Sequence, residues 1–314
     1  MDLSGIFPAL TTPFVGDGSV VSLGELKHNI QQYNRTGLAG YVVMGSTGES
    51  VLVSKAEWEA VLAAVKEVAS RDKKLIAGTG AESTAETIER TKRAAELGYD
   101  AALVKTPYYY KPAYKPETYI AHYRRVADAS PIPVLLYSVP QFTGVALEAP
   151  EVVKLAEHPN IIGIKESSGN VQRVAEIIAS VRPAYAGRVA GALVTVPPAF
   201  EVLVGSAATV YPSLTIGARG AILALASALP EKCVALYELF QQGNHEKARQ
   251  LQAALLVASK LIVSECGIAG VKYVMDQRGY RGGLPRLPLF PLKDEQKKSL
   301  TALLETFEPA AMRA

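Results

Sequence analysis

Lys165 is the residue of this chain whose position points most directly to chemistry. It follows the apolar run Ile161–Ile164, which is typical of a buried strand. Lysine is rarely buried without a reason, and burial favours the neutral amine, which attacks carbonyl carbons and forms Schiff bases. Taken alone, a lysine at the end of a strand is more often ion-paired than nucleophilic, so the role of Lys165 must be inferred from the residues around it.

Two further features fit the same chemistry. Tyr137 lies near the end of the apolar run Val134–Val139. Adjacent strands are about 4.8 Å apart, so a phenol there could reach the substrate of Lys165 and move protons. Gly45–Gly48 is a glycine loop with two hydroxyl side chains, and its N–H groups, at the start of the helix that follows, would suit a carboxylate. An ordinary strand-to-helix turn has the same composition. Together the three features describe a site for a 2-oxo acid.

Side chains for other common mechanisms do not gather at the ends of the apolar runs. The four histidines fall in expected helices or linkers: His28, His122, His158 and His245. The two cysteines lack the CxxC spacing of a zinc site, and no pair of carboxylates follows a strand. The sequence therefore argues against metal catalysis and Ser–His–Asp chemistry. Because a lysine iminium is itself an electron sink, we expect no metal and no cofactor.

Eight apolar runs alternate with longer amphipathic segments and must position these residues. The runs are continuous, which is typical of parallel strands buried on both faces. Eight strand–helix units in about 220 residues predict a (β/α)8 TIM barrel, which typically takes about 250 residues and carries its site at the carboxyl ends of the strands. The expected strands are Ile6–Phe14, Gly40–Gly45, Lys74–Gly80, Ala101–Pro107, Val134–Val139, Ile161–Lys165, Phe200–Gly205 and Gly220–Ala226.

The segments between the runs predict helices. Ser54-x-x-Glu57 and Ser83-x-x-Glu86 have the pattern of capping boxes at helix starts. A doubly wound open sheet is the alternative fold, but it would usually show a glycine-rich nucleotide loop after the first strand, and no GxGxxG motif follows that strand here. The expected helices on the barrel include Ala56–Ala69, Ser83–Leu97 and Glu117–Ala127.

The chain divides into a barrel domain, residues 1–229, and a C-terminal helical region, residues 230–314. Helices are clearest there at Glu231–Phe240, Glu246–Val263 and Ile268–Asp276. An apolar insertion between residues 182 and 198 competes with Phe200–Gly205 as the seventh strand. We favour Phe200–Gly205, because its last residue then ends a strand and opens a helix.

Composition narrows the class of protein. The chain has 314 residues, 49% of them hydrophobic, and a net charge of +3. A strongly basic nucleic-acid binder is excluded. No signal peptide and no run of about 20 apolar residues is present, so we expect a cytoplasmic protein that binds neither membranes nor nucleic acids. Two cysteines, Cys233 and Cys266, exclude a disulfide scaffold and are expected to be reduced core thiols.

Four short motifs carry a family likeness: Gly45–Glu49, Tyr137–Pro140, Ile164–Ser167 and Gly205–Ser206. In combination they resemble the dihydrodipicolinate synthase and N-acetylneuraminate lyase family, from Gly5 to about Pro288. The resemblance implies a (β/α)8 barrel and a class I aldolase that uses the small-molecule 2-oxo acid pyruvate. It also implies a homotetramer built as a dimer of dimers.

The resemblance implies roles for particular residues. Lys165 matches the Schiff-base lysine and Tyr137 the proton shuttle, while Ser46 and Thr47 match residues that hold the pyruvate carboxylate. In that family a tyrosine matching Tyr109 comes from the neighbouring subunit and completes a hydroxyl relay with the residues matching Tyr137 and Thr47. Further expected substrate-binding residues are Ser167, Gly205 and Ser206.

The chain departs from the family at positions that affect the second substrate. Phe142 stands where dihydrodipicolinate synthases carry an arginine that grips aspartate semialdehyde, and a phenyl ring makes no bidentate pair with a carboxylate. As a synthase, the chain would need another cation, such as Arg286 or Lys111. The family's lysine-inhibition site is also altered, since Lys55, Trp58 and Glu82 stand at its positions, and we predict no inhibition by lysine.

Other motifs look like 4-hydroxy-2-oxoglutarate aldolase, namely Ser130–Pro140, Val204–Ala207 and Gly267–Lys272. We therefore expect cleavage of 4-hydroxy-2-oxoglutarate, or a related 4-hydroxy-2-oxo acid, to pyruvate and an aldehyde. The alternatives are 4-hydroxy-tetrahydrodipicolinate synthase and an aldolase or dehydratase of 2-oxo-3-deoxy sugar acids. A non-catalytic binding protein is a fourth reading, against which the intact Lys165 and Tyr137 argue.

Overall fold

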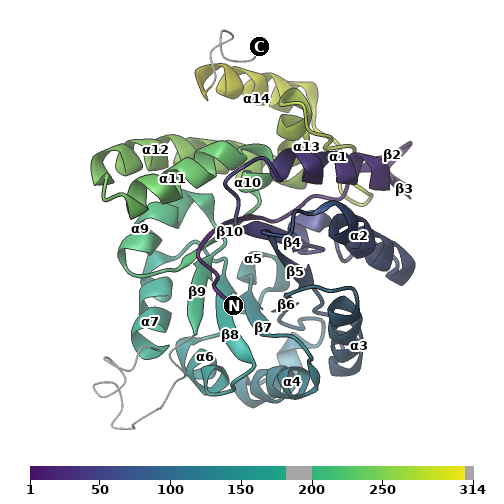
Figure 1. Ribbon diagram of the computed structural model, residues 1–314, viewed down its shortest axis with the longest axis vertical. Helices are drawn as coiled ribbons and strands as arrows, with labels where there is room; N and C mark the ends of the chain where they lie inside the picture. Colours follow the sequence, from purple (N-terminus) through teal and green to yellow (C-terminus); the bar gives the residue numbers. More distant parts are fainter. Residues whose placement is uncertain (182–199, 308–314) are drawn as a thin grey trace.

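Eight parallel strands close into a barrel at the centre of the molecule (Figure 1). The computed structural model describes residues 1–181 and 200–307. The barrel strands are β1 (Gly5–Pro8), β4 (Gly40–Val43), β5 (Lys74–Gly78), β6 (Ala101–Lys105), β7 (Val134–Ser138), β8 (Ile161–Glu166), β9 (Glu201–Val204) and β10 (Gly220–Leu223). Their order is β1-β10-β9-β8-β7-β6-β5-β4. A parallel bridge between Ala9 and Val42 joins the two ends, and the predicted TIM barrel is confirmed.

Each expected strand is present, but the first was predicted too long. β1 ends at Pro8, and Phe14 belongs to a small antiparallel hairpin of β2 (Phe14–Val15) and β3 (Val20–Val21). Two glycines in the connecting turn have φ of 70° and 90°, a conformation that favours glycine. The hairpin therefore interrupts what the apolar pattern suggested was one strand.

The seventh strand forms where Phe200–Gly205 predicted it, as β9. The competing apolar stretch between residues 182 and 198 lies outside the described residues, and its role stays open. β9 pairs with β8 so that Leu203 lies beside Lys165. Gly205 consequently follows the end of the strand that borders the lysine.

Side chains of the strands fill two apolar layers. Phe7, Val42, Ile76, Leu103 and Leu135 belong to the cluster inside the barrel. Other strand residues pack against the surrounding helices in a second, larger cluster. Both faces of the sheet are thus buried, which explains why the sequence shows continuous apolar runs and no alternation.

Helices surround the barrel (Figure 1). They are α1 (Leu23–Tyr33), α2 (Lys55–Val68), α3 (Thr84–Glu96), α4 (Pro116–Ala129), α5 (Pro140–Thr143), α6 (Ala149–Ala156), α7 (Val171–Val181), α9 (Val210–Thr215) and α10 (Leu225–Ala228), with short 3-10 turns η1 (Ser46–Gly48), η2 (Lys111–Ala113) and η3 (Ala207–Thr209). At both predicted helix starts the serine caps the helix, since the hydroxyl of Ser54 accepts the N–H of Glu57 and that of Ser83 accepts the N–H of Glu86. The predicted capping box at Ser83 was wrong in part, because the Glu86 carboxylate pairs with Arg90 instead. At Ser54 the full capping box forms, because the Glu57 carboxylate also accepts the Ser54 N–H at 2.8 Å.

The C-terminal helices lie together along one side of the barrel (Figure 1). They are α11 (Pro230–Gln241), α12 (His245–Ala258), the π-helix η4 (Ser259–Glu265), α13 (Gly267–Gln277) and α14 (Asp294–Phe307). The expected single helix Glu246–Val263 was wrong in part, because the α-helix ends at Ala258 and continues as η4. α11 contacts β1 directly, so this region rests on the barrel. The domain boundary at residues 229 and 230 stays a prediction.

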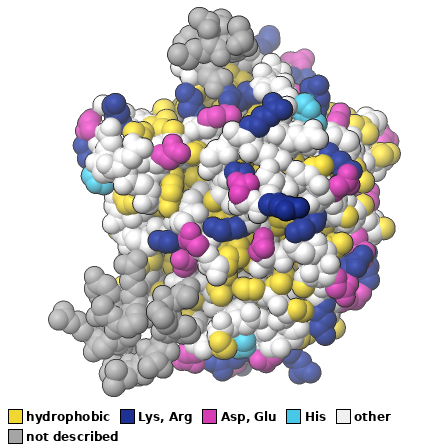
Figure 2. Space-filling model, in the orientation of Figure 1, with side chains coloured by type: hydrophobic (Ala, Val, Ile, Leu, Met, Phe, Trp, Pro, Cys, Tyr) yellow, Lys and Arg dark blue, Asp and Glu magenta, His cyan; other side chains and the backbone are white. Residues whose placement is uncertain are grey.

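The state of the two cysteines and the distribution of surface charge agree with what the amino-acid composition predicts. Cys233 and Cys266 are buried and unpaired, as predicted, and burial raises the pKa of both thiols. Figure 2 shows acidic and basic side chains interspersed over one face of the molecule, which agrees with the small net charge. Among the described residues, no helix combines the length and the apolar character needed to span a membrane.

Candidate active site

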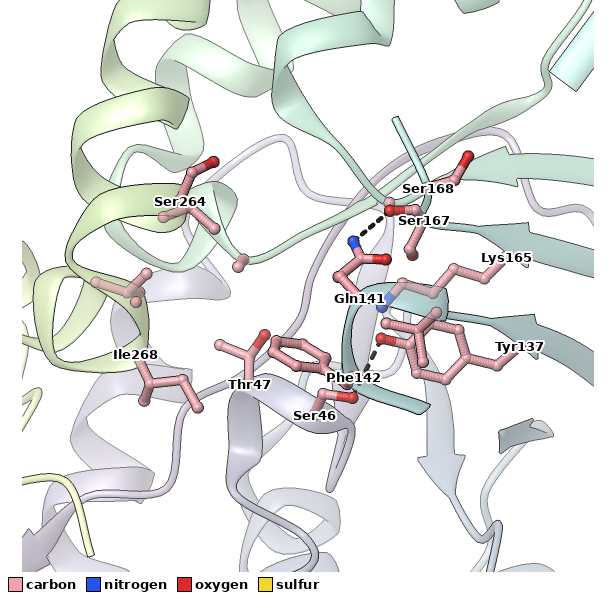
Figure 3. Close-up of a pocket in the computed structure, with 16 residues that line it drawn as sticks. Ser46, Thr47, Tyr137, Gln141, Phe142, Lys165, Ser167, Ser168, Ser264 and Ile268 are labelled. Carbon is pink, nitrogen blue, oxygen red and sulfur yellow. Dashed lines mark hydrogen bonds between the residues drawn. The ribbon is translucent and has the colours of Figure 1, made fainter. Parts of the chain in front are cut away.

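A cavity of about 430 Å³ opens at the carboxyl ends of the barrel strands, where this fold places its sites (Figure 3). Six of the predicted site residues line it: Ser46, Thr47, Tyr137, Lys165, Ser167 and Gly205. The other lining residues are Val139, Gln141, Phe142, Ser168, Ala224, Val263, Ser264, Gly267, Ile268 and Val271. The strands, the η1 turn and the C-terminal helices therefore all contribute to one site.

A one-residue irregularity in β8 brings Lys165 beside Tyr137. The pairing of β7 with β8 shifts after Val134 and Ile161, which leaves Ile162 as an extra residue. From there on, the register places Tyr137 opposite Lys165. If the two strands paired without this shift, Ile164 would lie opposite Tyr137. Because side chains alternate between the two faces of a strand, Lys165 would then point away from the barrel interior.

Lys165 and Tyr137 face each other in a buried environment. The lysine side chain is 4% exposed, and its Nζ lies 4.2 Å from the centre of the Tyr137 ring. The Tyr137 hydroxyl lies 3.2 Å from the Oγ of Ser46, within hydrogen-bond distance (Figure 3). The described lining residues include no second lysine and no arginine, histidine or carboxylate. A buried amine next to a phenol with a hydroxyl behind it suits attack on a carbonyl carbon and movement of a proton.

The Gly45–Glu49 segment forms the wall next to Tyr137. Met44 and Glu49 bracket it with φ of 58° and 56°, a region that residues other than glycine rarely adopt. Strain of this kind is often found at functional sites. The prediction that a helix starts directly at this loop was wrong. The left-handed residue Glu49 ends the η1 turn, and α2 begins only at Lys55.

A buried ion pair fixes this segment against the C-terminal helices. The Nζ of Lys272 lies 2.5 Å from the Oε1 of Glu49, and the two side chains are 1% and 0% exposed. Lys272 also donates to the carbonyl oxygens of Thr12 at 2.8 Å and Leu284 at 2.7 Å. The other carboxylate oxygen of Glu49 accepts the N–H of Arg286 at 2.8 Å. The shape of the loop thus depends on residues far along the chain.

The turn after Lys165 leaves one hydroxyl free for a ligand. The Oγ of Ser167 is buried and has no hydrogen-bond partner among the described residues, while its carbonyl oxygen accepts the side-chain amide of Gln141 at 2.5 Å. Glu166 holds the turn by accepting the N–H of Ser168 at 3.1 Å and its hydroxyl at 2.8 Å, and burial raises the pKa of this carboxyl. A Cβ at Gly205 would lie 1.8 Å from the Ser167 Oγ, so a glycine is required there.

Two predicted site residues do not line the cavity. Ser206 lies just before η3, and its carbonyl oxygen accepts the N–H of Thr209 at 3.2 Å. Tyr109 is 72% exposed on the loop after β6, where its ring packs edge-on against Tyr110 at 4.9 Å. Because this loop points its rings toward solvent, a single chain does not bring Tyr109 to the lysine.

Sequence reasoning missed the far wall of the cavity. Gln141 comes from α5, and Ser264 comes from the π-helix η4. Figure 3 shows Ser264 and Ile268 on the side of the cavity opposite Lys165. π-Helices are frequent at functional sites, but the apolar spacing over Glu246–Val263 predicted a continuous helix. No signal in the sequence pointed to Ser264.

The described lining residues hold no replacement for the missing arginine at Phe142. The guanidinium of Arg286 donates to the carboxylate of Glu57 at 2.8 and 2.9 Å and thereby lowers the pKa of Glu57 to about 2. Neither Arg286 nor Lys111 lines the cavity, whereas Phe142 does. In the described parts of the chain, no group of His, Cys, Asp and Glu side chains is placed to hold a metal ion.

A model of the dihydrodipicolinate synthetase family matches residues 2–307 of this sequence. The chain belongs to this family. Dihydrodipicolinate synthetase family members are pyruvate-dependent class I lyases that form a Schiff base with a lysine, so this chain is an enzyme of that class. The family resemblance drawn from the four short motifs is thereby confirmed.

Relatives match over nearly the whole chain. A 4-hydroxy-tetrahydrodipicolinate synthase from Exiguobacterium sp. is 37% identical over 304 residues, which is 97% of this chain and 98% of the relative. A protein of the same name from Methanothrix thermoacetophila is 37% identical over 300 residues, 96% of this chain and 95% of the relative. The crystal structure of a chloride-inhibited dihydrodipicolinate synthase from Acinetobacter baumannii, complexed with pyruvate, has a TM-score of 0.86, 32% identity and coverage of 96% and 98%. These names do not support the expected closer likeness to 4-hydroxy-2-oxoglutarate aldolase.

Proposed function

We propose that Lys165 is the Schiff-base residue and that it uses bound pyruvate to make or break a carbon–carbon bond. The observation that supports this most strongly is the buried amine of Lys165, held 4.2 Å from the Tyr137 ring centre in a cavity with no other cation among its described lining residues. Lys165 Nζ adds to C2 of pyruvate, and the C2 oxygen leaves as water to give the iminium. Loss of a C3 proton then gives the enamine, the carbon nucleophile.

The other residues of the cavity divide the remaining tasks. The enamine C3 attacks the carbonyl carbon of an aldehyde, and Tyr137 delivers the proton that the new hydroxyl oxygen requires. In the cleavage direction Tyr137 removes that proton as the C3–C4 bond breaks. Ser46 and Thr47 line the cavity beside Tyr137, and we assign them to the pyruvate carboxylate. We assign Ser167, whose hydroxyl has no partner among the described residues, and Gly205, which leaves room for it, to the border of the second substrate.

For the second substrate, 4-hydroxy-tetrahydrodipicolinate synthase chemistry is the first candidate. In this reaction the enamine would condense with aspartate semialdehyde. The candidate is supported by the names of relatives that match over 96% to 97% of the chain. Phe142 argues against this candidate, because the described lining residues include no arginine or second lysine that could pair with the carboxylate of aspartate semialdehyde.

Cleavage of 4-hydroxy-2-oxoglutarate, or of a related 4-hydroxy-2-oxo acid, is the second candidate. Beyond Lys165 the polar lining groups are hydroxyls and an amide, from Gln141, Ser167, Ser168 and Ser264. They favour a 4-hydroxy-2-oxo acid with a neutral hydroxylated tail over 4-hydroxy-2-oxoglutarate itself, whose second carboxylate would also lack a cation among the described lining residues. Such groups hydrogen-bond neutral hydroxyls well, but they cannot make the bidentate charged pair that an arginine makes with a carboxylate. Aldol cleavage or dehydration of 2-oxo-3-deoxy sugar acids would use the same groups.

Two assays on purified protein separate the candidates. One follows the disappearance of aspartate semialdehyde in the presence of pyruvate, and the other follows pyruvate released from 4-hydroxy-2-oxoglutarate. Lys165→Ala is the control in both, and the reaction with the larger Lys165-dependent kcat/KM identifies the second substrate. If neither substrate reacts while a 2-oxo-3-deoxy sugar acid does, synthase chemistry and cleavage of 4-hydroxy-2-oxoglutarate are both wrong, and the sugar-acid alternative replaces them.

We also propose that the chain assembles as a homotetramer, a dimer of dimers, in which Tyr109 of one copy completes the site of another. Exposed apolar side chains support association, because Val51, Tyr109 and Phe142 are 65%, 72% and 66% exposed. In this arrangement Tyr109 forms a hydroxyl relay with Tyr137 and Thr47. Light scattering of the purified protein tests the assembly, and a monomer at micromolar concentration would contradict it.

A further inference from the structure

A carboxylate from a neighbouring loop holds the segment that carries Tyr109. Glu82 lies between β5 and α3, and its Oε2 accepts the N–H of Tyr108 and the N–H of Tyr109, both at 2.9 Å. Its Oε1 accepts the Nζ of Lys105 at 3.3 Å. Two consecutive N–H groups on one charged oxygen fix the orientation of both peptide planes, and therefore the direction in which the tyrosine side chains leave the backbone.

Lys105 completes the arrangement from the end of β6. Its side chain is 13% exposed, and its Nζ lies 5.0 Å from the centre of the Tyr108 ring. Gly80 leaves room for it, because a Cβ there would lie 2.9 Å from the Lys105 Cγ. Burial alone would raise the pKa of the Glu82 carboxyl, but the N–H groups of Tyr109 and Tyr108 and the charge of Lys105 together hold it below its usual value. Glu82 is therefore a charged acceptor at neutral pH.

We call this arrangement of Glu82, Lys105 and the N–H groups of Tyr108 and Tyr109 the clamp. It does not serve to bury the Glu82 and Tyr109 side chains. Tyr109 is 72% exposed, and the Glu82 side chain is 40% exposed. The ion pair with Lys105 is half-buried, since the lysine side chain is 13% exposed, but that pair requires neither of the two tyrosine N–H groups. A carboxylate that also orients the backbone of an exposed tyrosine is better explained by what that tyrosine does elsewhere.

We propose that Glu82 is a positioning residue, whose carboxylate directs Tyr109 so that its phenol reaches the cavity of a second copy of the chain. This inference rests on the proposed function, because it takes Tyr109 as the tyrosine lent between copies. Glu82 itself touches no reacting atom. It acts only through the direction of the backbone at Tyr108 and Tyr109.

Kinetics of Glu82 variants give the first test. Glu82→Ala removes the acceptor, and we expect kcat to fall about tenfold, which is part of the roughly 10²- to 10⁴-fold that a proton-transfer group typically contributes, because the tyrosine itself is still present. The KM for pyruvate should stay within about twofold, because the pyruvate site lies within one chain. Glu82→Gln keeps an oxygen that accepts both N–H groups and should retain most of the activity. Glu86→Ala is the matched control, since Glu86 pairs with Arg90 on the same helix.

A double-mutant cycle with Tyr109→Phe separates positioning from general damage. If Glu82 acts through Tyr109, the double variant Glu82→Ala/Tyr109→Phe has the kcat of Tyr109→Phe alone. If the two losses multiply, or if Glu82→Gln is as impaired as Glu82→Ala, the inference is wrong. Should Glu82→Ala fail to fold, the cycle is run with Glu82→Ser, which also removes the carboxylate.

Two readouts distinguish this inference from the proposed function. Borohydride trapping of pyruvate on Lys165 should be unchanged in Glu82→Ala, and its failure in the wild type would contradict the proposed function alone. Amide hydrogen exchange at Tyr108 and Tyr109 should be slow in the wild type and in Glu82→Gln, and at least about tenfold faster in Glu82→Ala. Fast exchange at both amides in the wild type overturns the clamp, whatever reaction the enzyme catalyses.

Discussion

Replacing Lys272 by methionine tests how the Gly45–Glu49 segment is held. The substitution keeps the length of the side chain and removes the charge that lies 2.5 Å from Glu49. The Glu49 carboxylate would stay buried without its cation, and breaking such a pair costs about 3 to 5 kcal/mol. With an unfolding entropy of about 2.1 cal/mol/K per residue, this corresponds to a fall in Tm of about 5 to 8 °C for a chain of 314 residues.

The assay is thermal unfolding followed by circular dichroism, with two comparison variants. Lys297→Met removes an exposed lysine that pairs with Asp294, and it should lower the Tm by about 1 °C or less. The double variant Glu49→Gln/Lys272→Met leaves no unpaired charge, so it should be more stable than Lys272→Met. A Tm of Lys272→Met within 1 °C of the wild type would refute the reasoning, as would a double variant whose loss equals the sum of the single losses.

Three further predictions concern the second substrate, pH and inhibition. Phe142→Arg should raise kcat/KM for aspartate semialdehyde about tenfold, because it supplies a charged hydrogen bond to the carboxylate, and an unchanged value would show that this position does not contact the substrate. Burial lowers the pKa of His122 from 6.5 to about 4, so on acidification the unfolded chain takes up a proton before the folded chain does. Between pH 6.5 and pH 4 this should lower the free energy of unfolding by about 3 kcal/mol. His122→Asn should remove this part of the pH dependence, measured as Tm at both pH values. Millimolar lysine should not inhibit the enzyme, because the Glu82 carboxylate already holds Tyr108, Tyr109 and Lys105, and an inhibition curve would show otherwise.

The barrel could be predicted because burial on both sides of a parallel sheet leaves a direct mark on the sequence. Continuous apolar runs identified all eight strands, including the choice of Phe200–Gly205 for the seventh. The hairpin at Phe14 and the π-helix η4 were missed for a common reason. Their apolar spacing resembles that of the regular elements they interrupt, and only long-range packing decides between them.

The site was predictable where it lies on strand ends and not where it depends on contacts between distant segments. Lys165 and Tyr137 follow buried runs, and the register places them opposite each other as expected. The extra residue Ile162, which makes that register possible, leaves no signature in the residue types. Likewise, nothing in the sequence indicated that Lys272 would anchor Glu49 or that Ser264 would face the cavity.

The most direct test of the central claim is borohydride reduction of the protein with pyruvate, followed by peptide mapping. We predict one pyruvate adduct per chain on Lys165, none in Lys165→Ala, and retention of the adduct in Tyr137→Phe, because the phenol moves a proton and does not hold the substrate covalently. An adduct on another lysine, or no adduct in the wild type, would contradict the assignment of Lys165 as the Schiff-base residue.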